Sequence, residues 1–426
     1  MAGESPAARV RRAATALAVG GLVVVVDGAD RENEADLLGA AELMTREQMT
    51  FLVRHTSGIV CAPMSAERCA ELRLPQMVER NTDAHNTAFT VSVDHVDSGT
   101  GVSAAARTRT VHALADCGTA PEQLNRPGHV FPLRARDGGV LVRPGHTEAA
   151  VDLLAVAGVN QVGVISELVA ADGEMLRGHQ ATEFADEHKL PLVTVADLVH
   201  YRLHTEKLVE RAASATLPTT FGEFRAIAYR NTVDGTEHLA LTMGDITAAS
   251  HTGHGVLTRV HSECLTGDIL GSTRCDCGAQ LRYSAQLIAD EGTGVIVYLR
   301  GHEGRGIGLA NKIHAYAFQD QGLDTVDANI ALGLPVDARH YDIGAQILVD
   351  IGASRLRMIT NNPAKTAGLE GYDLDIAGRI PLPTTPTQHN LRYLRTKRDR
   401  MGHDLAIGRD QPAISTVVGN SRPKHQ

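Results

Sequence analysis

Three cysteines between residues 264 and 277 constrain this chain more than any other feature. The stretch 259–280 reads RVHSECLTGDILGSTRCDCGAQ and contains Cys264, Cys275 and Cys277. A structural zinc site normally closes with four protein ligands, whereas a catalytic site leaves one position open for water. Three thiolates with no obvious fourth partner therefore indicate an open, reactive zinc, which places metal-assisted hydrolysis in the second half of the chain. The alternative is a closed zinc knuckle with a remote fourth ligand.

Composition bounds the size of the protein and its partners. A chain of 426 residues is long for one hydrophobic core, so two domains of about 200 residues each are expected. The net charge of −9 argues against a nucleic-acid partner but leaves room for local basic pockets that hold phosphate. Six cysteines are too few for a disulfide scaffold, which favours a reducing, cytoplasmic compartment.

The first residues superficially look like a secretory signal. Arg9, Arg11 and Arg12 precede the apolar run Ala13–Val26. That run ends in VVVVDG without a small-residue cleavage pattern, so a helix followed by a buried strand is the better interpretation. No apolar run approaches the roughly 20 residues of a membrane span, and no membrane partner is expected.

Apolar runs alternate with helical stretches, which predicts an α/β (α+β) protein of two mixed α/β domains in tandem. The polar stretch Tyr201–Thr220 is predicted to be a linker or bridging helix between domains 1–204 and 205–402. Residues 403–426 mix polar residues with Gly and Pro and are predicted to be a mobile tail. The predicted strands are Leu22–Asp27, Ala88–Asp94, Gln161–Ile165, Leu192–Val195, FRAIAYRN, LALTMGDI, Gly294–Leu299 and Leu356–Thr360, and a helix is predicted over Leu309–Asp320.

Two segments of the first half carry chemistry. The acidic run DRENEAD, residues 30–36, follows the strand VVVVDG and by itself could be a solvated turn. The segment RPGHT, residues 143–147, adds an arginine, a flexible glycine, an imidazole and a hydroxyl, which together suit a phosphate and a metal. A carboxylate and an imidazole, with waters and substrate oxygens, make an open site for a hard divalent cation.

These segments belong to a longer pattern. DRENEAD, NTAFTVSVD, GVSA, LNRPGHVFPLRA and RPGHTEAAVDL occur in this order between residues 30 and 153. Together they closely resemble 3,4-dihydroxy-2-butanone 4-phosphate synthase over most of residues 10–200. The resemblance implies conversion of D-ribulose 5-phosphate to the four-carbon phosphate and formate, with Mg²⁺ or Mn²⁺ as cofactor. A metal that bridges the vicinal oxygens of a ketose stabilises the enediolate formed when a proton leaves.

The resemblance also assigns residues. Glu32 and His146 would bind the metal, and Glu34, His129 and Glu167 would form the acid–base set. His129 could instead cap the loop after Gly128, and Cys61 could line the pocket or serve as a buried small hydrophobe. The residues implied to hold the sugar phosphate are Arg31, Glu32, Asp36, Arg143, Pro144, Gly145, His146, Thr147 and Glu167.

Two positions depart from the family pattern. Ala35 stands where the family usually has Gly, which is tolerable unless the position needs a positive φ. Ala106 stands where the family has Asp, in GVSAAAR, and removes a carboxylate that could orient substrate or anchor Arg107. Ala106 therefore leaves open an alternative in which the first half is impaired and serves as a folding or dimerisation scaffold.

The second half resembles another enzyme family. RVHSECLTGD, STRCDCGAQL, YLRGHEGRGIGLANKIHAYAFQDQGLDT and TNNPAK are similar to GTP cyclohydrolase II from about residue 205 to 385. The resemblance implies that zinc held by Cys264, Cys275 and Cys277 activates water for attack on the imidazole carbon of guanine. Ring opening would release formate, and the products would be 2,5-diamino-6-(5-phosphoribosylamino)pyrimidin-4-one, formate and pyrophosphate.

Catalytic roles in this half fall on Tyr316, Asp337 and Arg339. Tyr316 matches the family tyrosine near the zinc, although a tyrosine on a helix often packs in a core. Asp337 matches the proposed proton acceptor, and Arg339 matches the proposed nucleophile for pyrophosphate release. Because a guanidinium stays protonated, Arg339 could instead stabilise the charge of the leaving group. The residues implied to bind GTP are Arg259, Val260, His261, Ser262, Glu263, Gln280, Glu303, Gly304, Arg305, Thr325, Thr360 and Lys365.

The two resemblances together predict a bifunctional enzyme that supplies riboflavin synthesis from both precursors. Two alternatives remain: an enzyme with the GTP activity alone, and a non-catalytic nucleotide-binding regulator with structural zinc. The retained Tyr316, Asp337 and Arg339 argue against the regulator. A homodimer is expected because the resembled families share their sites across subunits.

Overall fold

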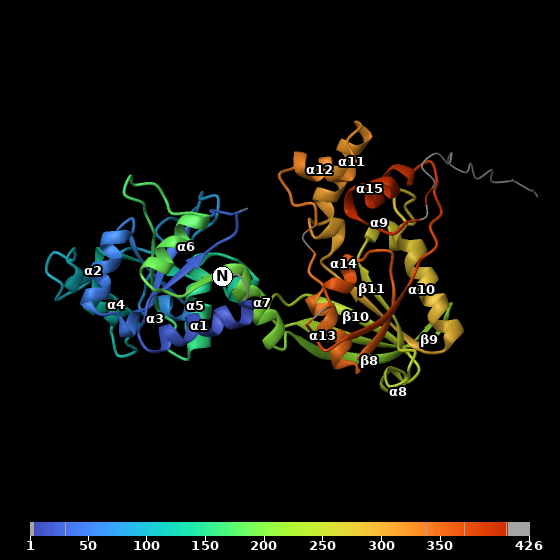
Figure 1. Ribbon diagram of the computed structural model, residues 1–426, viewed down its shortest axis with the longest axis horizontal. Helices are drawn as coiled ribbons and strands as arrows, with labels where there is room; N and C mark the ends of the chain where they lie inside the picture. Colours follow the sequence, from blue (N-terminus) through green and yellow to red (C-terminus); the bar gives the residue numbers. More distant parts are fainter. Residues whose placement is uncertain (1–3, 30, 338, 370, 406, 408–426) are drawn as a thin grey trace, which may run out of the picture. The chain divides into compact units, whose positions relative to one another are not determined.

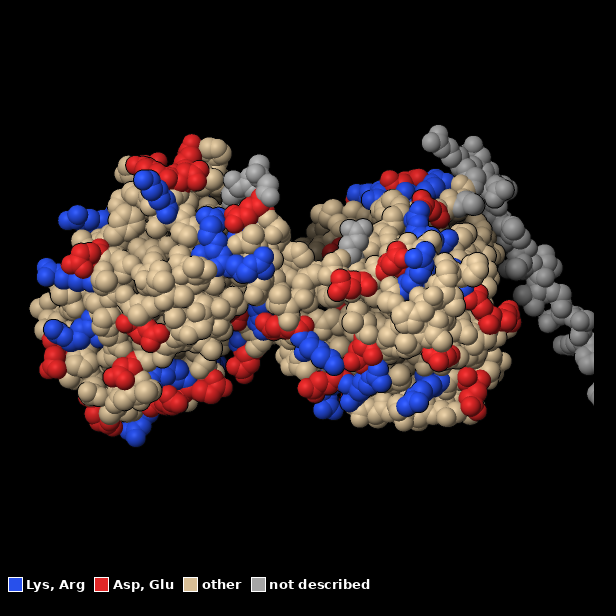
Figure 2. All heavy atoms as spheres, turned by 60° about the horizontal axis from the view of Figure 1, so that its bottom comes forward, with Lys and Arg blue, Asp and Glu red and all other residues tan. Residues whose placement is uncertain are grey.

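The structure is a computed structural model that describes residues 4–29, 31–337, 339–369, 371–405 and 407. The chain divides into two compact units, residues 1–206 and residues 207–426 (Figure 1). Over the face visible in Figure 2, Lys and Arg side chains are interspersed with Asp and Glu on both units. Among the described residues, no helix is both long enough and apolar enough to cross a membrane.

The described part of the first unit contains a mixed seven-stranded sheet in the order β4-β5-β3-β6-β2-β1-β7. Its strands are β1 (Val23–Val26), β2 (Ala35–Ala40), β3 (Val60–Met64), β4 (Val93–His95), β5 (Leu124–Arg134), β6 (Gly163–Glu167) and β7 (Leu192–Thr194). Its α-helices are α1 (Pro6–Ala18), α2 (Arg46–His55), α3 (Ala66–Glu71), α4 (Ala104–Ala115), α5 (His146–Ala157), α6 (Gly178–Glu187) and α7 (Val195–Thr205). Short 3₁₀ turns, η1 (Ala41–Leu43), η2 (Pro121–Gln123) and η3 (Gly139–Leu141), connect them.

Helices cover both faces of this sheet. Successive residues of a strand point to opposite faces, so Val23 and Val25 pack with α1, α5 and α7, while Val24 packs with α2, α4 and α6. This burial on both faces explains the continuous valine run of β1. Local signals begin the helices: Thr45 and Gln48 form a reciprocal capping box at α2.

The described part of the second unit also forms a seven-stranded sheet, in the order β14-β13-β11-β12-β10-β9-β8. Its strands are β8 (Val209–Thr219), β9 (Gly222–Asn231), β10 (Glu237–Met243), β11 (Val256–Ser262), β12 (Gly294–Leu299), β13 (Arg355–Ile359) and β14 (Asp375–Ile380). Its helical segments are α8 (Ile246–Ser250), α9 (Leu265–Asp268), α10 (Cys277–Glu291), η4 (Glu303–Arg305), α11 (Leu309–Asp320), α12 (Thr325–Ala331), α13 (Asp342–Asp350), α14 (Ala364–Ala367) and α15 (Leu391–Met401).

Two hydrophobic clusters hold the second unit together. One packs α13 on one face of the sheet through Ala345 and Leu348, and the other packs α10 through Ala285 and Ile288. Helices α11, α12 and α15 gather beyond one end of the strands (Figure 1). The loops that follow β11 and β12 point toward that group and carry the cysteine and glycine motifs.

The predicted fold class, two mixed α/β domains in tandem, is confirmed. Gly294–Leu299 and Leu309–Asp320 are β12 and α11 as predicted. The linker prediction is wrong for most of its length, because residues 209–219 form β8. Only the end of Ala88–Asp94 enters a strand, β4, although Phe89 and Thr90 each make an isolated bridge. Of the predicted tail 403–426, residues 406 and 408–426 lie outside the described residues.

Candidate active sites

The acidic loop after β1 folds around one buried carboxylate. Asp27 Oδ2 accepts a hydrogen bond from Arg31 Nη1 at 2.7 Å and from the backbone N–H of Glu32 at 3.2 Å. Asp27 Oδ1 accepts from the backbone N–H of Glu34 at 2.9 Å. This carboxylate therefore fixes the directions of the side chains that follow it. Asp30, the first residue of the predicted DRENEAD motif, lies outside the described residues.

Glu32, His146 and Asp27 form a cluster that could hold a metal. Their ligand atoms lie within 4.8 Å of one another, and Glu32 Oε2 is 3.6 Å from His146 Nδ1. Asp36 Oδ1 is 3.9 Å from the same nitrogen. His146 Nε2 and Asp36 Oδ1 are buried without a hydrogen-bond partner in the structure. Carboxylates and an imidazole with unused capacity fit a hard divalent cation that also binds waters and substrate oxygens.

The charges of this cluster depend strongly on one another. The nearby His146 and Arg31 hold the pKa of Glu32 at about 2, despite burial. Burial raises the pKa of Asp36 to about 7, although the charge of His146 opposes the rise. Burial alone would lower the pKa of His146, but the carboxylates of Asp36 and Glu32 outweigh it and raise that pKa to about 9.

Two guanidinium groups converge at the start of α5. A Cβ placed on Gly145 would lie 2.7 Å from Arg143 Nη1 and 2.9 Å from Arg31 Nη2, so a side chain there would displace at least one of the two guanidinium groups. Arg143 is oriented by Glu148, whose Oε2 accepts from its Nη1 at 2.6 Å. Thr147 is buried in the first turn, after Pro144 and Gly145. Two arginines beside the free N–H groups of a helix start suit a phosphate.

His129 is oriented by a carboxylate, Asp94, that is not among the site residues predicted from the sequence. His129 Nδ1 lies 2.7 Å from Asp94 Oδ2, and the His129 backbone N–H donates to Asp94 Oδ1 at 3.0 Å. A Cβ on Gly101, which has φ +75°, would lie 1.9 Å from Asp94 Oδ2. About half of the His129 side chain is exposed, so the pair can exchange protons with a substrate. Asp94 is the last residue of the segment NTAFTVSVD, and this position was the sequence feature that could have identified it.

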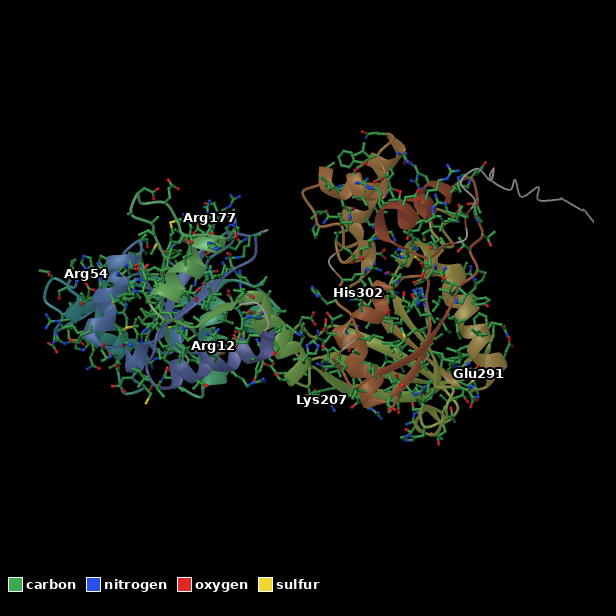
Figure 3. All side chains as sticks on the ribbon, viewed as in Figure 1. Arg12, Arg54, Arg177, Lys207, Glu291 and His302 are labelled. Atoms are coloured by element: carbon green, nitrogen blue, oxygen red, sulfur yellow. The ribbon has the colours of Figure 1, made fainter. Side chains whose placement is uncertain are left out.

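Glu167, Cys61 and Asp36 come from the neighbouring strands β6, β3 and β2. Glu167 lies opposite Asp36 in the register of the antiparallel strands β2 and β6. Its carboxylate accepts a hydrogen bond from Ser57 Oγ at 2.6 Å. Cys61 is 2% exposed, and burial together with the charges of Glu167 and Asp36 raises its pKa. Glu34 pairs with Arg177, which is labelled in Figure 3, at 3.1 Å.

The two departures from the family pattern have clear structural settings. Ala35 is the first residue of β2, and its φ angle is not positive. The backbone therefore tolerates a side chain at this position. Ala106 is the third residue of α4, whose N-cap is Ser103. Arg107 donates to the Gly58 carbonyl at 2.8 Å, and its Nε has no partner in the structure.

The three cysteines of the second unit meet as the zinc prediction requires. Their sulfur atoms lie within 4.8 Å of one another, and Cys264 Sγ is 3.7 Å from Cys275 Sγ. Two thiolates on a tetrahedral zinc with Zn–S bonds of about 2.3 Å lie roughly 3.8 Å apart. A Cβ on Gly267 would lie 2.7 Å from Cys275 Sγ and 3.1 Å from Cys264 Sγ. The glycine therefore lets the turn close around the sulfur atoms.

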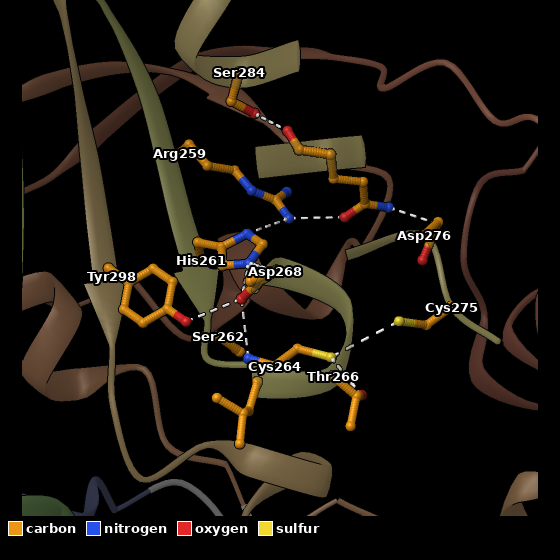
Figure 4. A network of polar contacts seen from close by, with 12 residues as sticks. Arg259, His261, Ser262, Cys264, Thr266, Asp268, Cys275, Asp276, Ser284 and Tyr298 are labelled. Carbon is orange, nitrogen blue, oxygen red and sulfur yellow. Dashed lines mark hydrogen bonds and ion pairs between the residues drawn. The ribbon is translucent and has the colours of Figure 1, made fainter. Parts of the chain in front are cut away.

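Asp268 organises the turn that carries Cys264 (Figure 4). Its Oδ2 accepts from the Cys264 backbone N–H at 3.0 Å and from Tyr298 Oη at 2.9 Å. His261 Nε2 lies 3.1 Å from both Asp268 oxygens. Burial lowers the pKa of His261 to about 4, so the ring is neutral near pH 7. Asp268 is not among the residues predicted from the sequence, although it lies within the segment RVHSECLTGD.

Arg259 extends this network toward α10 (Figure 4). It is 4% exposed and donates to the Ile359 carbonyl at 2.9 Å and to Gln280 Oε1 at 2.8 Å. Gln280 in turn donates to Asp276 Oδ2 at 2.7 Å. Asp276 stands between two of the cysteines, so the guanidinium and the cysteine turn are held in one frame.

The three cysteines line a pocket of about 1070 Å³, a volume that includes its open mouth. Seven cationic side chains line it, whereas its carboxylates are Glu263 and Glu303. Arg305 has a positive φ of 67°, and its two Nη atoms are buried without a partner in the structure. Burial and the charges of Arg259 and Arg339 lower the pKa of Lys365 well below its usual value. The cations are Arg259, Arg274, Arg305, Arg339, Lys312, Lys365 and Lys397.

Most of the predicted GTP-binding residues line this pocket. Val260 does not: its side chain is in the core, and its carbonyl accepts from Lys365 Nζ at 2.8 Å. Glu303 uses its carboxylate within the protein, since Oε2 accepts from the Leu265 backbone N–H at 2.7 Å. The predicted residues that line the pocket are Arg259, His261, Ser262, Glu263, Gln280, Glu303, Gly304, Arg305, Tyr316, Thr325, Arg339, Thr360 and Lys365, with all three cysteines.

Asp337 and Arg339 form an ion pair of 2.5 Å, in which only the arginine lines the pocket. Burial opposes the charge of Arg339, but the Asp337 carboxylate more than offsets it and raises the pKa of the guanidinium above its ordinary value. A guanidinium held this firmly in its protonated form is suited to stabilising negative charge and lacks the free lone pair of a nucleophile.

The last described helix and the residues after it supply pocket residues that the sequence did not predict. Tyr393 and Lys397 of α15 and His403 line the pocket. Lys397 Nζ donates to Asp276 Oδ1 at 2.8 Å, and both groups are buried. Leu405 packs near Leu394 in a small cluster at the end of this segment. No spacing relation links these residues to the cysteine motif, so only the folded chain reveals them.

Comparisons with known proteins agree with this division. The family model for 3,4-dihydroxy-2-butanone 4-phosphate synthase matches residues 11–201, and the model for GTP cyclohydrolase II matches residues 210–381. A riboflavin biosynthesis protein RibBA of Salinispora arenicola is 55% identical over 414 residues, 96% of this chain and 98% of that protein. The RibBA of Mycobacteroides abscessus is 53% identical over 406 residues, 95% of this chain and 97% of that protein. The chain is also similar to the crystal structure of RibBX from A. baumannii, a two-domain 3,4-dihydroxy-2-butanone 4-phosphate synthase, with 31% sequence identity and a TM-score of 0.68. That match covers 88% of this chain and 100% of the RibBX chain.

Proposed function

Because this chain belongs to the RibBA family of riboflavin biosynthesis proteins, and is an enzyme with both 3,4-dihydroxy-2-butanone 4-phosphate synthase and GTP cyclohydrolase II activity, we propose which residues carry each reaction. The first unit converts D-ribulose 5-phosphate to 3,4-dihydroxy-2-butanone 4-phosphate and formate. The second hydrolyses GTP to 2,5-diamino-6-(5-phosphoribosylamino)pyrimidin-4-one, formate and pyrophosphate.

The observation that carries the proposal is the pocket of the second unit, where three clustered thiols face a wall of cations. Burial, together with repulsion from Arg259 and Arg339, lowers the pKa of Lys365. A nucleoside triphosphate carries several negative charges, and its binding would offset that repulsion. Arg305, with its two unpartnered nitrogens, is placed to contact a phosphate. Polar side chains that line the pocket near the cysteine turn, including Gln280 and Ser262, would contact the base and ribose.

Cys264, Cys275 and Cys277 would hold zinc, which when bound supplies a Lewis acid that activates water. Tyr316 Oη lies 3.3 Å from Thr266 Oγ1, beside the cysteine turn, where a phenol can donate to the reacting centre. Arg339, oriented by Asp337, would stabilise the charge of the departing pyrophosphate.

In the first unit, Glu32 and His146 would hold magnesium or manganese, which when bound stabilises negative charge on adjacent sugar oxygens. Arg31, Arg143 and the start of α5 would hold the phosphate and fix the carbon chain. His129, oriented by Asp94, would transfer protons at the sugar together with Glu34 and Glu167. Asp36, with its pKa near 7, could accept or return a proton close to the metal.

Product analysis tests this assignment. Purified protein given D-ribulose 5-phosphate and Mg²⁺ without GTP should release formate and the four-carbon phosphate. The same preparation given GTP should release formate and pyrophosphate. Formate from GTP alone would reject the proposed assignment of the first unit and favour a scaffold role for it.

We also infer a homodimer. The resemblance implies sites shared between subunits, and β8 forms an exposed edge of its sheet over nine consecutive residues, 210–218. An unpaired edge strand of this length is usually covered by another chain or element. Sedimentation at micromolar concentration should give twice the chain mass of 45.4 kDa, and a monomer mass would reject the inference.

A further inference from the structure

Lys312 of α11 is a buried cation to which none of the roles above has been given. It is 8% exposed and stands at the pocket wall beside the cysteine turn. Its Nζ lies 3.1 Å from Cys264 Sγ, 2.9 Å from Thr266 Oγ1 and 2.5 Å from Glu303 Oε1. An ammonium has three N–H donors, and these three contacts use all of them. Lys312 is therefore occupied within the protein and is not free to bind phosphate.

The contact with Cys264 matters because of the charge of the proposed metal site. Zinc with three thiolates carries a net charge of −1, which weakens it as a Lewis acid. A hydrogen bond from a cation to a ligating sulfur withdraws electron density from that sulfur, and such outer-shell contacts tune the metal. Lys312 makes this contact to the first cysteine of the motif.

The same ammonium reaches the proposed catalytic tyrosine. Thr266 Oγ1, which accepts from Lys312, lies 3.3 Å from Tyr316 Oη. The ammonium itself is 5.8 Å from the centre of the Tyr316 ring. One cation thus joins a metal ligand to the phenol that would act beside it.

Glu303 explains how the lysine is held. Glu303 Oε1 pairs with Lys312, while Oε2 accepts from the Leu265 backbone N–H in the cysteine turn. The GHEGRG turn therefore connects to the metal site through this ion pair. A plain packing role would require only the Lys312–Glu303 pair and would not require the contact with the sulfur.

We propose that Lys312 is a positioning residue of the GTP reaction: it partly neutralises the Cys264 thiolate, which raises the Lewis acidity of the bound metal, and it fixes the Thr266–Tyr316 pair. This inference rests on the proposed zinc site and deepens it. It predicts that loss of the ammonium changes the sulfur–metal bond as well as turnover.

Cobalt substitution in the full-length protein tests the proposal, because the energy of the sulfur-to-cobalt charge-transfer band reports the electron density on the thiolates. Lys312→Met keeps the aliphatic stem and removes the charge. The band should move to lower energy, zinc affinity should fall by about 10- to 100-fold, and kcat for GTP should fall more than KM rises. Lys312→Arg should return the band toward its wild-type position.

Arg274→Met is the matched control, since Arg274 lines the same pocket and lies over the Tyr316 ring at 4.9 Å, but pairs with Asp320. The charge-transfer band of this variant should stay unchanged.

An unshifted band in Lys312→Met with full metal occupancy would overturn the inference and leave a packing ion pair. If Lys312→Met does not fold, the Glu303→Gln/Lys312→Met double variant removes both charges and must show the same shift. Absence of any thiolate band in wild-type protein would instead overturn the proposed zinc site.

Discussion

Gly267 lies against the sulfur atoms of the proposed zinc ligands and leaves no room for a side chain. Because a Cβ there would lie 2.7 Å from Cys275 Sγ and 3.1 Å from Cys264 Sγ, Gly267→Ala should push the sulfur atoms apart. We predict zinc affinity at least about tenfold weaker and a matching loss of formate release from GTP. Formate release from D-ribulose 5-phosphate should stay at its wild-type rate. A zinc dissociation constant equal to that of the wild-type protein would contradict this prediction.

Ala106 stands where the family has Asp, which raises the question of whether the reaction of D-ribulose 5-phosphate needs a carboxylate at this position. It occupies the third position of α4, where an Asp would reach back to the N-cap Ser103. The orienting partner of His129 is Asp94, which this chain retains. We therefore predict that Ala106→Asp changes turnover of D-ribulose 5-phosphate by less than about threefold, since a helix cap contributes mainly about 1 kcal/mol of stability. A gain of tenfold or more in kcat would contradict the prediction and support an impaired first unit.

His302 makes the second unit sensitive to acid. Burial and the charges of Arg339 and Lys365 lower its pKa to about 3, whereas an unfolded histidine has a pKa near 6.5. Below pH 6.5 the unfolded chain binds a proton that the folded chain does not, so stability falls as the pH drops toward 3. At pH 5 the cost is on the order of 2 kcal/mol.

His302→Gln should therefore lose less stability than wild type between pH 7 and pH 5. Denaturation followed by tyrosine fluorescence reports the second unit, because Tyr201 alone among the eight tyrosines lies outside residues 207–426. Equal losses in the two proteins would show that His302 does not titrate as described.

The site residues that could be predicted are those inside compact motifs, such as Cys264, His146 and Arg305. Their partners were missed when contact depends on the folded chain. Asp94 reaches His129 from 35 residues away, and Lys397 reaches Asp276 from 121 residues away. A sequence pattern identifies a reactive group, but only packing selects the carboxylate or ammonium that orients it.

At the scale of elements, α15 contributes to the pocket of the second unit although it follows the end of the matched family model at residue 381. We predict that Lys397→Met raises KM for GTP by roughly 10-fold or more, because it leaves the buried Asp276 carboxylate without its ion partner. Arg400→Met, on the same helix but in the exposed pairs with Asp324 and Asp327, should change KM by less than about twofold. Equal effects of the two substitutions would argue against a role for α15 in binding.

The elements that could be predicted are those with strong apolar patterns. β12 reads GVIVYL and is buried along almost its whole length, and the pattern gave its bounds correctly. β8 reads VERAASATLPT, and its exposure leaves no alternation of apolar and polar residues to mark a strand. Its pairing with β9 comes from the hairpin at Thr219–Gly222, which composition alone did not reveal.

At the scale of the whole molecule, the two proposed sites lie in different units of the chain. Each unit has its own sheet and hydrophobic clusters, and the acidic cluster and the cysteine cluster share no residue. Domains of this size fold around their own cores. The two proposed reactions are therefore expected to be chemically independent, each with its own proposed metal.

Formate release from one set of three proteins tests this central claim most directly. Wild type, Glu32→Gln and Cys275→Ser would each be assayed with D-ribulose 5-phosphate and, separately, with GTP. Glu32→Gln should lose formate release from the sugar phosphate and keep it from GTP, and Cys275→Ser should show the reverse. Loss of both signals in either variant, with circular dichroism unchanged, would contradict the assignment of the two reactions to separate sites.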